Sequence, residues 1–225
     1  MPDAPRAIFD LDGTLIDSVH ALRVAGLSLL EELGREPVDV ATYKTFVGKG
    51  QKVQVERLLT HTGGIPDGDV EPWLAKYRAA YDPRAGGAGP YPGAVAALRA
   101  LADAGWRIGV CTQKPEGKAR LALSAFGFDM VESVVGGDTI PGALKPDPRL
   151  LERALAPLGA GEAIYVGDSE TDAETAQNGG LPFILHLNGY RHSSPDALLP
   201  TARFDDWADL PALAAQVVAE HDPAG

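Results

Sequence analysis

Five short runs of aliphatic or β-branched residues recur along the chain, and stretches with helical periodicity separate most of them. The runs lie at 7–9, 108–110, 131–135, 163–166 and 183–185. Amphipathic stretches occur at 93–104, 116–126 and 148–157. Short apolar runs without alternation are typical of strands buried on both faces, and a helix between two such strands is typical of a parallel crossover. The pattern predicts an α/β fold with a doubly wound parallel sheet.

The first two apolar runs are separated by a much longer interval than the others. About 95 residues separate them, whereas a crossover between parallel strands usually needs roughly a dozen or more. Helical periodicity continues through this interval, in segments near 18–33, 39–47, 50–61 and 69–81. We therefore expect an all-helical domain at 18–85, inserted into an α/β domain that consists of residues 1–17 and 86–225.

Composition and charge narrow the classes of partner. Of 225 residues, 45% are apolar and 23% are charged, which is ordinary for a globular protein. The net charge of −11 repels a phosphate backbone, so we expect no nucleic acid partner. No run approaches the roughly 18 apolar residues that span a bilayer, and no signal peptide pattern precedes the first run, so we expect a cytoplasmic protein without membrane contact, as a monomer or homodimer. The single cysteine, Cys111, excludes a disulfide framework and is interpreted as a small apolar core residue.

Polar residues gather where the predicted strands end. Asp10 to Thr14 follow the first run, Thr112 to Lys114 the second, and Asp168 to Asp172 the fourth, while Lys145 lies beyond the third. Ligands of open parallel sheets bind at this edge. Any one of these acids alone is more typical of a helix cap, but several acids at one edge repel unless a divalent cation compensates. The joint pattern predicts a magnesium site, and magnesium indicates a phosphorylated substrate.

Four segments resemble the motifs of the haloacid dehalogenase superfamily, in the family's order and at suitable spacing. They are FDLDGTLIDS at 9–18, VCTQK at 110–114, KPDP at 145–148 and GDSETD at 167–172. The helical insertion resembles that family's cap of the first type, over a Rossmann-like core. Within the superfamily, FVGKGQKVQVERLL at 46–59 and NGYRH at 188–192 are most similar to phosphoglycolate phosphatases.

The resemblance implies roles for the acidic residues. Asp10 would attack phosphorus and form an aspartyl-phosphate, which divides one difficult displacement into two easier ones. Asp12 would protonate the leaving alkoxide and then deprotonate the hydrolytic water. Mg²⁺ would be held by Asp10, the backbone carbonyl of Asp12 and Asp168, with Asp172 binding the ion or supporting its ligands.

The resemblance also implies how the phosphoryl group is held. Thr112 and Lys145 would bind its oxygens, together with backbone N–H groups of Leu11 and Asp12. Gln113 belongs to the same set and stands where the family commonly has Asn, so its longer amide changes a phosphate or leaving-group contact.

The substrate is expected to be a small phosphomonoester, with 2-phosphoglycolate favoured. In the insertion, Gly48 and Gly50 allow a tight loop, and the ammonium of Lys49 between them would suit a substrate carboxylate. Asp12 disfavours a dehalogenase or a phosphonate hydrolase, because relatives with those activities lack an acid there. A phosphatase of a sugar phosphate or nucleotide, a sugar-phosphate mutase and a non-catalytic binding protein remain alternatives.

Overall fold

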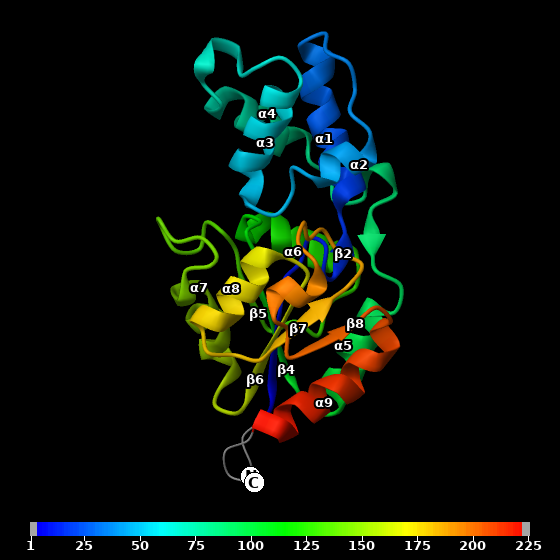
Figure 1. Cartoon of the computed structure of the whole chain (residues 1–225), viewed down its shortest axis with the longest axis vertical. Helices are drawn as coiled ribbons and strands as arrows, with labels where there is room; N and C mark the ends of the chain where they lie inside the picture. The colour runs from blue at the N-terminus through cyan, green and yellow to red at the C-terminus, as the bar shows by residue number, and fades with distance from the viewer. Residues whose placement is uncertain (1–3, 222–225) are drawn as a thin grey trace.

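A six-stranded parallel sheet forms the centre of the computed structural model, which describes residues 4–221 (Figure 1). Its strands are β1 Arg6–Phe9, β4 Arg107–Cys111, β5 Ser133–Val135, β6 Ala163–Gly167, β7 Phe183–His186 and β8 Ala202–Phe204. They lie in the order β5-β4-β1-β6-β7-β8, and every neighbouring pair is parallel. The predicted α/β class is confirmed.

Helices cover both faces of the sheet, because side chains alternate along each strand. In β1, Ala7 and Phe9 belong to the apolar cluster under α5, α6 and α9, whereas Ile8 belongs to the cluster under α7 and α8. These helices are α5 Ala94–Asp103, α6 Glu116–Ala125, α7 Pro148–Leu155, α8 Glu170–Asn178 and α9 Leu210–His221. The sheet is therefore doubly wound, as the apolar runs predict.

The insertion is a group of four helices with an apolar core of its own. The helices are α1 Val19–Glu32, α2 Val40–Lys44, α3 Gly50–His61 and α4 Glu71–Ala80. Their core includes the buried rings of Tyr43 and Tyr77. Gly26 lets α1 approach one of these rings, since a Cβ at that position would lie 2.6 Å from the Tyr43 hydroxyl.

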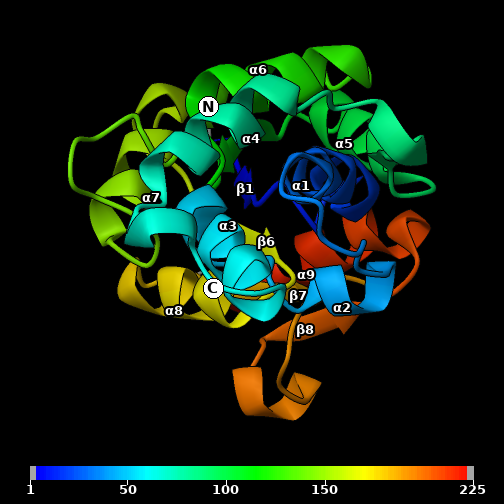
Figure 2. The ribbon, with the colours of Figure 1, turned by 90° about the horizontal axis from the view of Figure 1, so that it is seen from above.

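The insertion lies over the carboxyl edge of the sheet (Figures 1 and 2). The chain leaves the sheet through β2 Ile16–Asp17 and returns through β3 Gly89–Pro90, and these two short strands pair antiparallel. Short 3₁₀ helices occur at Pro66–Gly68, Ala85–Gly87, Ala156–Leu158, Pro195–Leu198 and Trp207–Asp209. None of the helices in residues 4–221 is both long and apolar enough to cross a membrane.

Candidate active site

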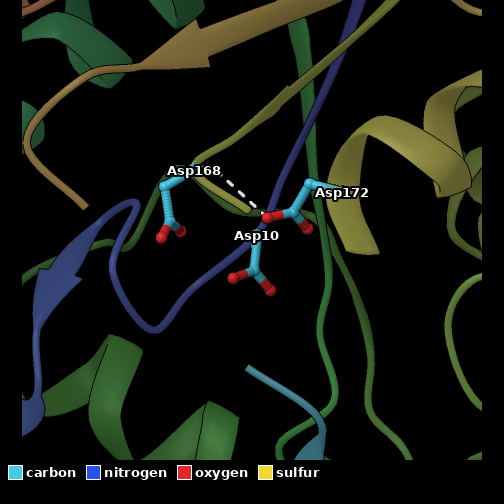
Figure 3. Close-up of side chains that lie close together, drawn as sticks. All are labelled: Asp10, Asp168 and Asp172. Atoms are coloured by element: carbon cyan, nitrogen blue, oxygen red, sulfur yellow. Dashed lines mark hydrogen bonds between the residues drawn. The ribbon is translucent and has the colours of Figure 1, made fainter. Parts of the chain in front are cut away.

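Three buried carboxylates meet at the carboxyl edge of the sheet (Figure 3). Asp10 follows β1, Asp168 follows β6, and Asp172 lies in the first turn of α8. One carboxylate oxygen from each lies within 4.8 Å of the others. The parallel topology brings β1 and β6 together as neighbours, and this places residues 158 positions apart in one cluster.

Asp172 both caps a helix and belongs to the cluster. Its Oδ2 accepts hydrogen bonds from the backbone N–H groups of Asp168 and Ser169, at 3.1 and 3.0 Å, and from the Ser169 hydroxyl at 2.7 Å. The bond from the Ser169 N–H, together with the bond from the Asp172 N–H to Ser169 Oγ at 3.3 Å, forms a capping box at the start of α8. Its Oδ1 accepts from Lys145. Because protein donors engage both oxygens, Asp172 is held in a single orientation beside the other two acids.

Lys145 lies between two of the three carboxylates. Its Nζ donates to Asp10 Oδ1 at 2.8 Å, to Asp172 Oδ1 at 2.6 Å and to the Tyr165 hydroxyl at 3.1 Å. Burial alone would lower the pKa of the Lys145 ammonium, but Asp10 and Asp172 together hold that pKa well above its usual value. Lys145 is therefore a fixed positive charge beside Asp10.

Asp168 has neutral hydrogen-bond donors only. Its Oδ1 accepts from the Thr14 hydroxyl at 2.7 Å and its Oδ2 from the backbone N–H of Tyr190 at 2.7 Å. No ion pair with a side chain of residues 4–221 neutralises it. Burial, with the charges of Asp172 and Asp10, raises the pKa of Asp168 well above its usual value.

Two glycines make room for this carboxylate. A Cβ at Gly13 would lie 2.5 Å from Asp168 Oδ2, and a Cβ at Gly189 would lie 2.2 Å from Asp168 Cβ. Gly13 also has a φ of +93°, which favours glycine. The backbone is thus shaped closely around Asp168.

The charge balance of the cluster fits a divalent cation. Burial raises the pKa of Asp10 to about 6, although Lys145 opposes the shift. Three buried carboxylates facing one ammonium carry an excess of negative charge, which a hard cation with oxygen ligands would compensate. Asp10, Asp168 and Asp172 are therefore a group that could hold a metal ion.

The other motif residues lie around the same acidic cluster. Thr112 follows β4 and is almost fully buried, and the Gln113 amide donates to the Lys145 carbonyl at 2.9 Å. Leu11 and Asp12 form the turn after β1, where the Leu11 carbonyl accepts from the N–H groups of Leu15 and Ile16 at 3.0 Å.

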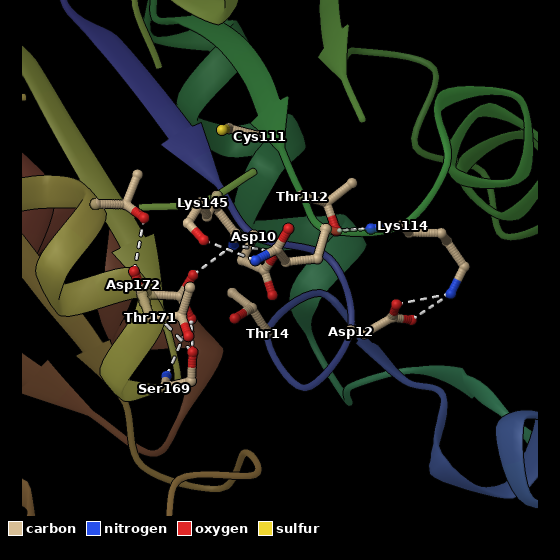
Figure 4. A network of polar contacts seen from close by, with 12 residues as sticks. Asp10, Asp12, Thr14, Cys111, Thr112, Lys114, Lys145, Ser169, Thr171 and Asp172 are labelled. Carbon is tan, nitrogen blue, oxygen red and sulfur yellow. Dashed lines mark hydrogen bonds and ion pairs between the residues drawn. The ribbon is translucent and has the colours of Figure 1, made fainter. Parts of the chain in front are cut away.

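Asp12 makes an ion pair for which the sequence analysis has no counterpart (Figure 4). Lys114 Nζ donates to both of its carboxylate oxygens at 2.7 Å. The Lys114 side chain is 1% exposed, and its Nζ lies 4.7 Å from the centre of the Tyr81 ring. Burial alone would lower the pKa of Lys114, but Asp12 outweighs it and raises that pKa. The available sequence signal was a lysine two positions after Thr112, at the end of a strand.

The insertion narrows the space over the site. A cavity of about 40 Å³ lies between the two parts, whereas pockets for small molecules usually measure roughly 300–1,000 Å³. It is lined by Asp10, Asp12, Leu22, Val47, Gly48, Gly50, Gln51, Gln54, Thr112, Gln113, Lys114, Lys145, Asp168, Ser169 and Tyr190. The insertion therefore leaves little room over the acidic cluster in this structure.

Only part of the predicted cap loop lines this cavity. Gly48 and Gly50 do, but Lys49 is exposed and instead lines an adjacent cavity of about 370 Å³. Gln51, which the sequence analysis did not select, lines the central cavity and is 7% exposed.

Cys111 lies beside the site without a reactive environment. Its side chain is buried, and burial raises the pKa of the thiol to about 12. The thiol therefore stays protonated near neutral pH, in keeping with its interpretation as an apolar core residue.

Comparisons with known proteins identify the family of the chain. Residues 7–186 match the family of haloacid dehalogenase-like hydrolases. Phosphoglycolate phosphatases from Rhodobacter capsulatus and Rhodospirillum rubrum are 39% and 43% identical to the chain; each alignment covers 93% of it, and 96% and 90% of those proteins. The crystal structure of a predicted phosphoglycolate phosphatase from Haemophilus somnus 129PT, 25% identical, superimposes with a TM-score of 0.86 over 95% of this chain and 99% of that one. The chain belongs to the haloacid dehalogenase-like hydrolases.

Proposed function

We propose that the chain is a Mg²⁺-dependent phosphatase that hydrolyses 2-phosphoglycolate through an aspartyl-phosphate on Asp10. The observation that carries the proposal is the position of Asp10. It lines the cavity, Lys145 holds one of its oxygens, and two further buried carboxylates adjoin it. The substrate is proposed from the relatives, which are named phosphoglycolate phosphatases.

Asp10 is the nucleophile in this proposal. Lys145 engages Oδ1, and no hydrogen bond from residues 4–221 engages Oδ2. Lys145 and a bound cation would both favour the ionised form against the burial that raises the pKa of Asp10. The carboxylate would then be available to attack phosphorus.

Asp10, the backbone carbonyl of Asp12 and Asp168 would hold the ion, and Asp172 would support them. When bound, Mg²⁺ would compensate negative charge on the phosphoryl group and on the carboxylates around it. Asp172 supports this arrangement through Lys145 and through the backbone of Asp168, which it contacts on opposite oxygens.

The phosphoryl oxygens would be bound at the ends of β1 and β4. Thr112 supplies a hydroxyl, Lys145 a charge, and the turn after β1 the backbone N–H groups of Leu11 and Asp12. Gln113 donates to the backbone of Lys145, which fixes the segment that carries this charge.

The reaction would proceed in two steps. As a bond forms between Asp10 and phosphorus, the bond from phosphorus to the substrate oxygen breaks, and Asp12 gives its proton to that oxygen. Asp12 then takes a proton from water as the water attacks phosphorus, which releases inorganic phosphate and restores Asp10. Asp12 lines the cavity, as both steps require.

The cap domain, residues 18–85, would select the substrate. Gln51 is the residue best placed for this, because Arg78 Nε donates to its Oε1 at 3.2 Å and its buried Nε2 has no hydrogen-bond partner among residues 4–221. A donor in this position suits the carboxylate of phosphoglycolate. Lys49, at the adjacent cavity, is the second candidate.

A substrate panel tests the proposal. kcat/KM would be measured with Mg²⁺ for 2-phosphoglycolate, glycerol phosphate, a sugar phosphate, a nucleoside monophosphate and p-nitrophenyl phosphate. We expect 2-phosphoglycolate to be hydrolysed most efficiently. Equal rates for glycerol phosphate would contradict carboxylate recognition, isomerisation of the sugar phosphate without phosphate release would indicate a mutase, and no turnover of any compound would indicate a binding protein.

A further inference from the structure

We propose that Lys114 is a positioning residue that holds the Asp12 carboxylate in place for proton transfer, and that the Tyr81 ring holds Lys114. The inference rests on the proposed function, because it concerns the acid and base of that reaction. It assigns a role to the last residue of the VCTQK segment and to one residue of the helical insertion.

The contact between Lys114 and Asp12 is short and symmetric, and the lysine side of it is buried. The ammonium lies 2.7 Å from each carboxylate oxygen, which fixes the carboxylate in two directions at once. With the Lys114 side chain 1% exposed, little water is available to replace Asp12 as its partner. Separating the pair leaves the buried ammonium of Lys114 uncompensated, so the pair is costly to break.

Tyr81 limits where this ammonium can go. Tyr81 directly follows α4, the last helix of the insertion. The centre of its ring lies 4.7 Å from Lys114 Nζ, within cation–π range. Tyr81 is itself 6% exposed. Lys114 is therefore held between the turn after β1 and the end of the insertion.

Lys118 provides a matched control within the same chain. It lies in the first turn of α6, four residues after Lys114, and its Nζ is 5.9 Å from the centre of the same Tyr81 ring. It makes no hydrogen bond with Asp12 and does not line the central cavity. Removing its charge leaves the pair of Lys114 and Asp12 intact.

Lys114 also lines the cavity, so a second role has to be separated from positioning. A residue that binds the substrate carboxylate would affect KM for 2-phosphoglycolate and leave p-nitrophenyl phosphate unchanged. A residue that positions Asp12 would affect kcat, with KM unaltered. It would also impair leaving groups that need a proton far more than p-nitrophenolate, which leaves without one.

The test compares Lys114→Met with Lys118→Met on both substrates in the presence of Mg²⁺. For Lys114→Met we expect kcat for 2-phosphoglycolate to fall about 10²-fold, as for lost general acid catalysis, with KM unchanged. With p-nitrophenyl phosphate, the variant should release a rapid burst of p-nitrophenolate followed by slow turnover, because Asp12 is no longer placed to deprotonate water. Lys118→Met should match the wild type on both.

Other outcomes overturn the inference. They are a higher KM for 2-phosphoglycolate at unchanged kcat, equal losses on both substrates without a burst, or activity equal to that of Lys118→Met. Wild-type protein that hydrolyses neither substrate would instead reject the proposed function.

A second pair of variants covers the case in which Lys114→Met does not fold. Tyr81→Phe keeps the ring and should retain wild-type kcat, whereas Tyr81→Leu should reduce kcat for 2-phosphoglycolate and show the burst of p-nitrophenolate that is expected for Lys114→Met. Equal behaviour of these two variants would overturn the contribution of the ring.

Discussion

The backbone N–H of Tyr190 donates to the Asp168 carboxylate at 2.7 Å, which ties the loop after β7 to the acidic cluster. The hydroxyl of the same residue donates to Asp17 at 2.7 Å and accepts from the Val19 N–H at 2.9 Å, where the insertion begins. One residue therefore connects the candidate metal site, through its backbone, to the base of the first cap helix, through its side chain.

Tyr190→Phe should separate these two contacts. The backbone bond to Asp168 remains, but the buried N–H of Val19 loses its partner, so we expect the free energy of unfolding to fall by about 1–3 kcal/mol. Mg²⁺ affinity, measured by calorimetric titration, should stay unchanged. Tyr91→Phe is the control, since its hydroxyl donates to an exposed carbonyl at Asn188 and its loss should cost less. A large loss of Mg²⁺ affinity in Tyr190→Phe would contradict this division.

Metal removal tests the acidic cluster. EDTA should abolish phosphatase activity and Mg²⁺ should restore it, because the excess negative charge of Asp10, Asp168 and Asp172 is then compensated. Ca²⁺ should inhibit, since it accepts more oxygen ligands and allows Asp10 to bind with both of its oxygens. Full activity in metal-free buffer would refute the assignment.

Gln51→Leu and Lys49→Ala rank the two candidates for substrate selection. Gln51 lines the same cavity as Asp10, whereas Lys49 lines the adjacent cavity, so we expect the larger effect from Gln51. For Gln51→Leu we expect KM for 2-phosphoglycolate to rise about ten- to a hundredfold, as for the loss of a hydrogen bond of roughly 1.5–3 kcal/mol to a charged group. KM for p-nitrophenyl phosphate should hardly change in either variant. A larger effect from Lys49→Ala would place the carboxylate in the adjacent cavity.

His186 should make stability depend on pH. Burial lowers the pKa of this imidazole to about 4, although the Gly13 carbonyl, 3.0 Å from its Nδ1, opposes the shift. The unfolded chain binds this proton near pH 6.5, so the unfolded state gains protons first and stability is lost as pH falls from about 6.5 to 4, by about 1.4 kcal/mol per unit.

Carboxyl groups with raised pKa values change stability with pH in the opposite direction, but they do so in the wild type and in His186→Gln alike. The difference between the two proteins therefore isolates the contribution of His186. Urea denaturation at pH 7.5, 6 and 5 should show the wild type losing stability relative to the variant as pH falls. Parallel curves for the two proteins would contradict the buried neutral imidazole.

The strands of the sheet could be predicted from the sequence where burial on both faces requires apolar residues. The central strands have continuous apolar runs because both of their faces are covered, and the acids that follow them lie at one edge by topology. The edge strand β8 was not predicted, since Ala202 to Phe204 include an arginine and give too short a signal. The strand predicted at 131–135 begins at Ser133.

The missed site residues depend on contacts distant in sequence. Lys114 pairs with a carboxylate 102 positions earlier, and a lysine after a strand otherwise indicates a solvated side chain. Gln51 has an ordinary helical position, and its burial arises only where the insertion meets the core. Sequence patterns identify which residues begin and end elements, but not which polar side chains become buried when two parts of a chain pack together.

Asp10→Asn gives the most direct test of the central claim, that Asp10 is the phosphorylated nucleophile. Turnover of 2-phosphoglycolate would be measured with Mg²⁺, and the quenched wild-type reaction would be analysed by peptide mass spectrometry. We predict a phosphoryl group on the peptide that contains Asp10. We also predict a folded variant with residual activity at or below the roughly 10³–10⁴-fold over water that a site without its nucleophile retains. A folded Asp10→Asn protein with near-wild-type kcat would contradict it.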